Sequence, residues 1–357
     1  MARPRIYLDH AATTPVLPEA QAAMVEALGR WANPSSPHAE GRAAKAALER
    51  ARATIADALG WQHEIIITSG ASEAVSIVAA RAAVRGRAVG ATEHDIVPYA
   101  MGEGARTLPV GADGLIDREA LSAALAEGPT LVALQQVNNE TGVIQPLGDI
   151  IGEIRAAGSL LLADCAQSAG KIDLPQADFI AISAHKFGGP PGIGALLVRD
   201  LATLSPSGGQ EKGYRRGTQN LPAVAGMAAA LAARTHRDAM PRLAGLRDRL
   251  EQSVRAAGGT VIAEGTERLP AISAIALPGA SKDGLLIQLD LAGFAVSAGS
   301  ACSSGKLKAS RVLAAMGVPE DVAAGTLRVS MGPQTSDTHI DAFLAAFTGI
   351  AARAAAA

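Results

Sequence analysis

A short apolar run that ends in a lysine and a rigid turn is the feature that most constrains this fold. The run is Phe179–Ile182, and Ser183-Ala184-His185-Lys186 follows it directly. Four apolar residues suit a buried strand and are too few for a helix. The Gly/Pro-rich stretch 188–194 then excludes a regular helix and marks a tight turn. Lys186 is therefore expected at the end of a strand, held by a stiff turn.

A second predicted strand, upstream of the first, also ends in polar side chains. The run Ser159–Ala163 leads into Asp164 and, three residues later, Gln167. Ligands of open α/β sheets bind outside the carboxyl ends of the strands. A lysine held beside an acid and polar groups is a candidate Schiff-base lysine, although a solvated lysine is the alternative for that residue alone. Five side chains are expected to face one crevice: Asp164, Gln167, Ser183, His185 and Lys186.

The pattern Asp-x-x-Gln followed by Ser-x-His-Lys resembles the pyridoxal 5'-phosphate (PLP) site of the class V aminotransferase family, and within it the cysteine desulfurases of the NifS/IscS type. The resemblance extends over nearly the whole chain. It implies PLP fold type I, an α/β fold with a large domain around a mostly parallel seven-stranded sheet and a smaller α+β domain. Alternating strands and helices independently favour a parallel sheet. The predicted large PLP-binding domain is 15–257, and 1–14 with 258–357 form the small domain that carries the catalytic cysteine loop.

Further cofactor contacts are predicted on other segments. The turn Ser69-Gly70-Ala71-Ser72 opens a helix after the strand 64–68, and backbone amides at a helix N-terminus bind anions. We therefore assign Ala71 and Ser72 to the cofactor phosphate. The resemblance implies that His94 stacks on the cofactor ring and that Asn139 binds its phenolic oxygen or the substrate carboxylate. It also implies a homodimer in which Thr218 reaches the phosphate of the neighbouring site.

Two residues near the C-terminal end complete the predicted substrate site. Cys302 lies among small residues and glycines, as a reactive exposed thiol requires, whereas Cys165 is interpreted as structural. The surrounding Ser-x-Gly-Ser-Ala-Cys resembles the motif of one desulfurase subgroup. Arg328 stands inside an apolar run, where its planar fork suits a carboxylate. The resemblance implies that this carboxylate is the α-carboxylate of cysteine.

These residues predict a PLP-dependent L-cysteine desulfurase that forms L-alanine and leaves sulfur as a persulfide on Cys302, for delivery to an acceptor protein. Lys186 holds PLP and acts as the base at Cα, and His94 moves a proton on or off the substrate thiol. The alternative is a selenocysteine lyase or another class V aminotransferase-type enzyme, which would not need the glycine-rich cysteine loop. The sequence leaves open whether the sulfur serves iron–sulfur cluster assembly, tRNA thiolation, other cofactors or modified DNA.

The composition narrows the classes of protein to which this chain could belong. The chain has 357 residues, is 48% hydrophobic and carries a net charge of −2, so charge gives no reason to expect nucleic acid or membrane partners. Two cysteines are too few for a disulfide framework and suggest no metal site. There is no apolar signal core and no apolar stretch of about 18 residues, so a cytoplasmic protein is expected.

Overall fold

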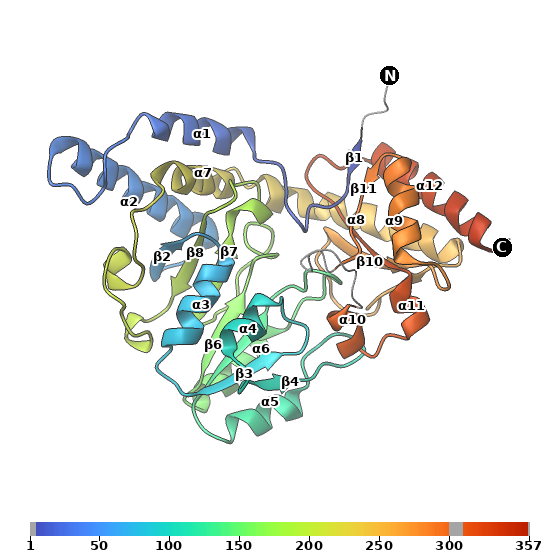
Figure 1. The fold of residues 1–357 in the computed structure, drawn as a ribbon, viewed down its shortest axis with the longest axis horizontal. Helices are drawn as coiled ribbons and strands as arrows, with labels where there is room; N and C mark the ends of the chain where they lie inside the picture. The colour runs from blue at the N-terminus through green and yellow to red at the C-terminus, as the bar shows by residue number, and fades with distance from the viewer. Residues whose placement is uncertain (1–4, 300–309, 356–357) are drawn as a thin grey trace.

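The computed structural model describes residues 5–299 and 310–355 (Figure 1). Its centre is a seven-stranded sheet in the order β2-β8-β7-β6-β5-β3-β4. Neighbours from β4 to β7 run parallel, and β8 is antiparallel to both β7 and β2. This confirms the predicted mostly parallel α/β fold, although β8 was not predicted. The strands are β2 (Glu64–Thr68), β3 (Gly86–Gly90), β4 (Arg106–Leu108), β5 (Thr130–Gln135), β6 (Leu160–Asp164), β7 (Phe179–Ser183) and β8 (Gly194–Val198).

Helices cover both faces of this sheet. In β2, Ile65 and Ile67 pack into the core beneath one helical layer, whereas Ile66 packs into the core on the opposite face. Burial on both faces explains why the central strands β5, β6, β7 and β8 are largely apolar rather than alternating. One layer contains α2 (Ala39–Leu59), α5 (Arg118–Leu125), α6 (Leu147–Ala156) and α7 (Leu221–Ala232), with α1 (Pro18–Leu28) against α7; the other contains α3 (Ala71–Arg81) and α4 (Ile96–Met101).

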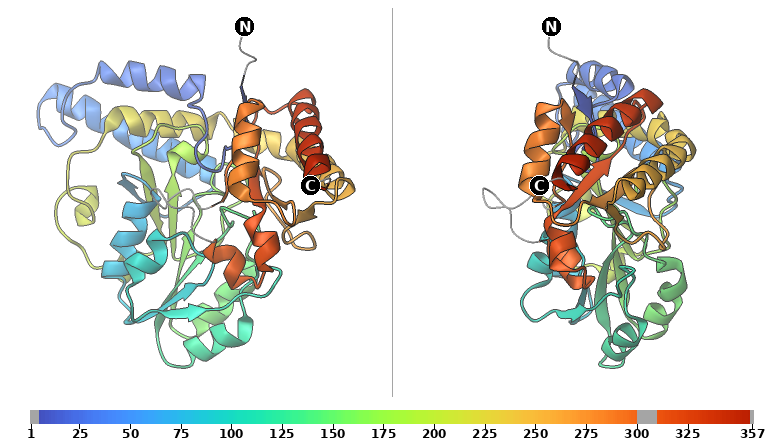
Figure 2. Two further views of the ribbon diagram at one scale, coloured as in Figure 1. Left: turned by 45° about the vertical axis from the view of Figure 1, so that its right-hand side comes forward. Right: turned by 90° about the vertical axis from the view of Figure 1, so that its right-hand side faces the viewer.

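A second, smaller group of elements lies beside the large sheet (Figure 2). Its core includes Phe294, Phe343 and Phe347, whose rings contact one another. The strands are β9 (Thr260–Val261), β10 (Ile272–Ala276) and β12 (Thr326–Ser330), which are antiparallel, and the parallel pair β1 (Ile6–Tyr7) and β11 (Phe294–Ala295). The helices are α8 (Thr235–Ala256), α9 (Lys282–Leu291), α10 (Arg311–Ala315), α11 (Glu320–Ala324) and α12 (Asp337–Ala355).

The long helix α8 packs its apolar side chains into this second core. Leu243, Leu246 and Leu250 are buried there with residues of β10 and α12. The predicted domain limits, which place 235–257 in the large domain, stay a prediction. The described part of the chain also contains three short 3₁₀ turns: η1 (Ala184–Lys186), η2 (Leu201–Thr203) and η3 (Glu211–Gly213).

The segment between β1 and α1 joins the two groups of elements. Asp9 bridges to Ser330 at the end of β12, and the amide of Thr14 donates to the carbonyl of His185, 3.0 Å away. This N-terminal segment therefore crosses from the smaller sheet to the turn after β7.

Gly194, at the start of β8, lies at the tightly packed end of the turn between β7 and β8. A Cβ at this position would lie 2.6 Å from the Cα of Gly70 and would also meet the carbonyl of Ile182, and neither backbone atom can swing aside. Gly194→Ala is expected to destabilise the fold by about 3 kcal/mol, because overpacking of a tight site has costs of this order. Urea denaturation measures the change.

The matched control is Gly148→Ala in α6, where nothing lies within 4 Å of the added methyl group. This variant is expected to be neutral or to stabilise the protein by up to about 1 kcal/mol. Equal stability of the two variants would contradict the packing argument.

Candidate active site

A cleft of about 500 Å³ opens at the carboxyl ends of β5, β6 and β7, a volume within the ordinary range for small-molecule sites. The predicted site residues that line it come from both groups of elements. The structure does not bring Thr218 into it; this side chain is exposed on the loop before α7. Cys302 lies outside the described residues. The lining includes Ala71, Ser72, His94, Asn139, Asp164, Gln167, Ser183, His185, Lys186 and Arg328.

Lys186 is fixed by the 3₁₀ turn that follows β7. Its Nζ donates to the carbonyls of Ala11 (2.7 Å) and Ala12 (2.8 Å), and the side chain is half-buried. The next residue, Phe187, is buried in the core and anchors the turn. The amine is therefore held on the wall of the cleft rather than in bulk solvent.

Asp164 is the last residue of β6, and it lies beside Gln135 of β5 in the strand register. One carboxylate oxygen, Oδ1, accepts from the amide of Ala166 at 2.9 Å. The pKa of Asp164 is raised, because the effect of burial outweighs the lowering by the Ala166 amide and by the charges of His94 and Lys186. A cationic N–H donor placed against this carboxylate would stabilise its charged form.

Gln167 carries a buried acceptor that has no partner. Its Nε2 donates to the carbonyl of Ala11 at 2.8 Å, while its Oε1 has no hydrogen-bond partner among the described residues. Buried polar atoms are rarely left unsatisfied, so this oxygen suits a donor on a bound ligand.

The N-terminus of α3 forms the anion-binding end of the cleft. Ala71 and Ser72 are the first two residues of this 11-residue helix, and their amides have no intrahelical acceptors. Gly70 precedes them, and its Cβ position lies 3.5 Å from the Ser183 hydroxyl oxygen. Converging amides and a hydroxyl at a helix N-terminus suit a phosphate.

Arg328 of β12 is buried, with 3% of its surface exposed. Its Nη2 donates to Asp9 Oδ1 and its Nη1 to the carbonyl of Asn139, both at 2.8 Å. The Nε has no partner among the described residues, so this N–H suits a carboxylate oxygen of a bound ligand.

Two further bases, His185 and Lys171, lie close enough to Lys186 for its charge to lower their pKa values. Burial, and then the charges of Lys186 and Lys171, lower the pKa of His185 to about 4. Lys171, 5% exposed, has its pKa lowered to about 7 by burial and by the charge of Lys186. Sequence analysis missed Lys171, because a lysine in a polar loop gives no sign of burial. It also missed the pairing of Asp9 with Arg328, and it missed Gln135, which the strand-end rule could have found.

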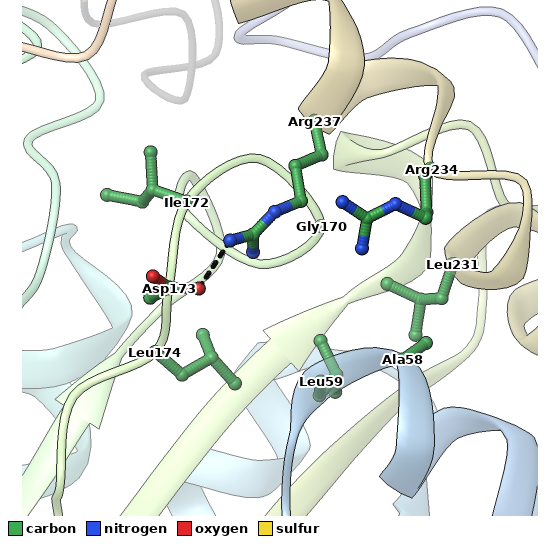
Figure 3. A pocket seen from close by; sticks show the side chains of 9 residues that line it. All are labelled: Ala58, Leu59, Gly170, Ile172, Asp173, Leu174, Leu231, Arg234 and Arg237. Atoms are coloured by element: carbon green, nitrogen blue, oxygen red, sulfur yellow. Dashed lines mark hydrogen bonds and ion pairs between the residues drawn. The ribbon is translucent and has the colours of Figure 1, made fainter.

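A second, smaller cavity lies between the end of α2, the loop after β6 and the start of α8 (Figure 3). Arg237 points across it and pairs with Asp173 at 2.6 Å. The volume of this cavity, about 20 Å³, holds roughly one water, which excludes an organic ligand.

No group of three or more His, Cys, Asp or Glu side chains in residues 5–299 and 310–355 is arranged to hold a metal ion. In the same ranges, every helix is too short or too polar to span a lipid bilayer.

Fold and cleft together are those of a PLP-dependent enzyme of fold type I. The family model described as aminotransferase class-V matches residues 6–343. A cysteine desulfurase of Cereibacter sphaeroides is 37% identical, over 95% of this chain and 94% of its own. The solved NifS-like protein of Rickettsia africae aligns with a TM-score of 0.89 at 31% identity, covering 97% of this chain and 99% of its own. A structure of SspA in complex with cysteine aligns with a TM-score of 0.78 at 30% identity, covering 93% and 100%.

The chain therefore belongs to the class-V aminotransferase family, whose members use PLP as cofactor. The cleft fits this group: an amine for the aldehyde, a buried carboxylate for the ring nitrogen, an unpartnered acceptor at Gln167 and amides for the phosphate. The individual roles predicted for these residues stay predictions.

The buried Lys171 makes the free energy of unfolding of the protein depend on pH. Its pKa is lower when folded, about 7, than in the unfolded chain, so below pH 7 the folded state bears the full cost of burying the charge. That cost declines by about 1.4 kcal/mol per pH unit above pH 7. Lys171→Met is therefore expected to be more stable than the parent protein at pH 7, with an advantage that shrinks towards pH 10. Denaturant titrations of the apoprotein at several pH values measure the difference.

The control is Lys45→Met, which changes an exposed lysine on α2. Its stability difference is expected to stay flat with pH. A gain in stability of Lys171→Met that is also independent of pH would contradict the interpretation of Lys171 as a buried amine.

Proposed function

We propose that this protein is a PLP-dependent L-cysteine desulfurase, which releases L-alanine and transfers sulfur to its own Cys302. The observation that carries the proposal is the convergence of Lys186, Asp164 and Arg328 on one cleft. A cofactor-binding lysine, an acid for the ring nitrogen and a guanidinium for an α-carboxylate are the groups that amino-acid chemistry on PLP requires. The relatives named cysteine desulfurase and the cysteine complex of SspA support the choice of substrate.

In this proposal five sets of contacts would hold the cofactor. Lys186 would bind it covalently and Asp164 would pair with the ring nitrogen. His94 would lie against the ring, and Gln167 would face the phenolic oxygen. The N-terminus of α3, with Ser183 and His185 nearby, would hold the phosphate. When bound, PLP withdraws electrons from the substrate Cα and thereby acidifies its proton.

The chain's own side chains then orient the substrate and move its protons. Arg328 would bind the α-carboxylate through its Nε, beside Asn139. With the cofactor bound, the amine of Lys186 would remove and return the proton at Cα. His94 moves the proton of the substrate thiol. General acid–base steps of this kind contribute about 100- to 10,000-fold each.

Cys302 takes the sulfur in the final step. Its thiolate attacks the substrate sulfur, an S–S bond forms and the Cβ–S bond breaks. The electron pair of the broken bond stays with the carbon skeleton, which gains protons and becomes alanine. The transferred sulfur is oxidised from sulfide to sulfane level, and Cβ is correspondingly reduced to a methyl group. Cys165 is unsuited to this role, because it is buried and burial raises the pKa of its thiol.

The proposal includes a homodimer and a sulfur-accepting protein, in a cytoplasmic setting such as iron–sulfur cluster assembly. Thr218 is exposed and does not line its own cleft. Its loop is held close to α3 of the same chain, where Arg215 pairs with Glu73 at 3.2 Å. A second copy would allow Thr218 to contribute to the neighbouring phosphate site.

A single-turnover reaction of the purified holoenzyme with L-cysteine tests the function. Alanine in solution and a persulfide on the Cys302 peptide, both read by mass spectrometry, are the expected products. Cys302→Ser should abolish the persulfide and keep the cofactor absorbance. Lys186→Ala should lower turnover at least about 100-fold and change that absorbance. Cofactor absorbance without a persulfide from L-cysteine would contradict the proposal, and L-selenocysteine would then be tried as substrate.

Asp9 supplies a second prediction, because it holds the guanidinium that orients the substrate. Asp9→Asn removes the charge that fixes Nη2 of Arg328. The KM for L-cysteine is expected to rise about 10-fold, the factor that loss of a charged hydrogen bond carries, with kcat changed less than about 3-fold. The control, Asp290→Asn, breaks an exposed pair with Arg5 and should leave both constants unchanged. An unaltered KM in Asp9→Asn would mean that the Asn139 carbonyl alone positions Arg328.

A further inference from the structure

A carboxylate lies next to the proposed phosphate site without being part of the cleft. Glu73 follows Ala71 and Ser72 in the first turn of α3, but unlike them it does not line the cleft. Its Oε2 accepts from the amide of Ser69 at 2.6 Å. A negative charge beside a phosphate is unfavourable, because like charges repel. A role other than contact with the cofactor would explain why Glu73 stands here.

The carboxylate of Glu73 is charged at neutral pH, and both of its oxygens have partners. Burial raises its pKa, but the hydrogen bonds from Ser69 and the charge of Arg215 outweigh burial, so the pKa lies below its ordinary value. The Nε of Arg215 donates to Oε1 at 3.2 Å, while Oε2 accepts from Ser69. The pairing with Arg215 therefore offsets the negative charge near the proposed phosphate site.

The bond from Ser69 to Glu73 differs from the usual cap of a helix. In a capping box, the carboxylate three positions after the cap residue accepts from the amide of the cap residue itself. The cap residue of α3 is Gly70, which has no side chain to contribute, and Glu73 accepts from the amide one residue earlier. The carboxylate therefore fixes the turn without occupying the amides of Ala71 and Ser72.

A second contact restrains the same turn from its carbonyl side. The hydroxyl of Thr68 donates to the carbonyl of Gly70 at 2.9 Å. This carbonyl and the amide of Ala71 belong to one planar peptide group, so the contact also fixes the direction of that amide. Glu73 restrains the peptide group between Thr68 and Ser69. The turn is thus held on both sides of Gly70.

Arg215 belongs to the loop before α7, and this loop contacts both ends of α3. At the first turn of the helix Arg215 pairs with Glu73. At the last residue of the helix, the Nη1 of Arg81 donates to the carbonyl of Tyr214 at 3.1 Å. The side chain of Arg215 is only 18% exposed, so its pair with Glu73 is partly shielded from solvent. An anchor outside α3 therefore keeps the carboxylate directed towards Ser69.

We propose that Glu73 is a positioning residue for the cofactor phosphate. Its carboxylate fixes the turn from which Ala71 and Ser72 present their amides, while Arg215 orients the carboxylate and offsets its charge. Amides already held in place bind an anion more tightly than amides that must be ordered during binding. The inference rests on the proposed function only in placing the phosphate at the N-terminus of α3.

Two substitutions of similar size separate this role from an effect of charge. Glu73→Gln and Glu73→Met both remove the negative charge, but only glutamine keeps an oxygen that can accept from Ser69. Glutamate, glutamine and methionine have similar helix propensities. A difference between the two variants therefore reports the hydrogen bond to Ser69. The control, Glu119→Met, removes an exposed acidic side chain from the first turn of α5.

Titration of each apoprotein with PLP, and with pyridoxal, which lacks the phosphate, tests the inference. The absorbance of the bound ligand gives a Kd for each. The Kd for PLP is expected to be about 5-fold higher in Glu73→Met than in Glu73→Gln, the factor that one neutral hydrogen bond carries. The Kd for pyridoxal should be equal in the two variants, because pyridoxal has no phosphate to place. Glu119→Met should bind both ligands as the parent protein does.

Amide hydrogen exchange tests the contact with no ligand present. In the apoprotein, exchange of the Ser69 amide is expected to be about 5-fold faster in Glu73→Met than in Glu73→Gln. Equal exchange rates in the two variants would overturn the inference.

The titrations can overturn it independently. Equal affinities of the two variants for PLP would do so, as would a loss of affinity in Glu73→Met that is the same for PLP and pyridoxal. A parent protein that binds PLP no more tightly than pyridoxal would also overturn the inference, because α3 would then hold no phosphate. A parent protein that forms no persulfide from L-cysteine would contradict the proposed function alone, and the titrations would still decide the role of Glu73.

Discussion

The parallel register of β5, β6 and β7 is the constraint on which the rest of the site depends. Gln135 lies opposite Asp164, and Asp164 lies opposite Ala181, so the three strands end at one edge of the sheet. Each strand delivers polar residues only where its apolar run stops, and the turn after β7 then delivers Lys186. Because both faces of these strands are buried, a shift in register would disrupt two cores at once.

The N-terminal segment converts this edge into a closed site. The carbonyl of Ala11 accepts hydrogen bonds from Lys186 and from Gln167, while Asp9 holds Arg328 on the opposite side. One short stretch of backbone thus joins the proposed cofactor lysine to the proposed substrate arginine. The site is held together by a few contacts between residues far apart in sequence.

The contacts between residues far apart in sequence explain which features of the site the sequence could and could not predict. Apolar runs that end in Asp164 or Lys186 are local signals, and with the resemblance they predicted the sheet and about half of the residues that line the cleft. The pairing of Asp9 with Arg328 joins positions 319 residues apart, and no local pattern encodes it. β8 was missed because its run follows a Gly/Pro turn that was interpreted only as a turn. The burial of Lys171 depends on packing around a polar loop, so composition could not reveal it.

The buried bases show how the site is matched to an anionic cofactor. Burial lowers the pKa of His10 and His185 to about 4 and of Lys171 to about 7, and the charge of Lys171 contributes to the lowering at both histidines. At pH 7 the two histidines are therefore largely uncharged, and Lys171 is near the midpoint of its titration. A phosphate at the N-terminus of α3 and a carboxylate on Arg328 would bring negative charge towards this cluster. Binding of anions and protonation of the bases would then favour each other, because each lowers the cost of the other.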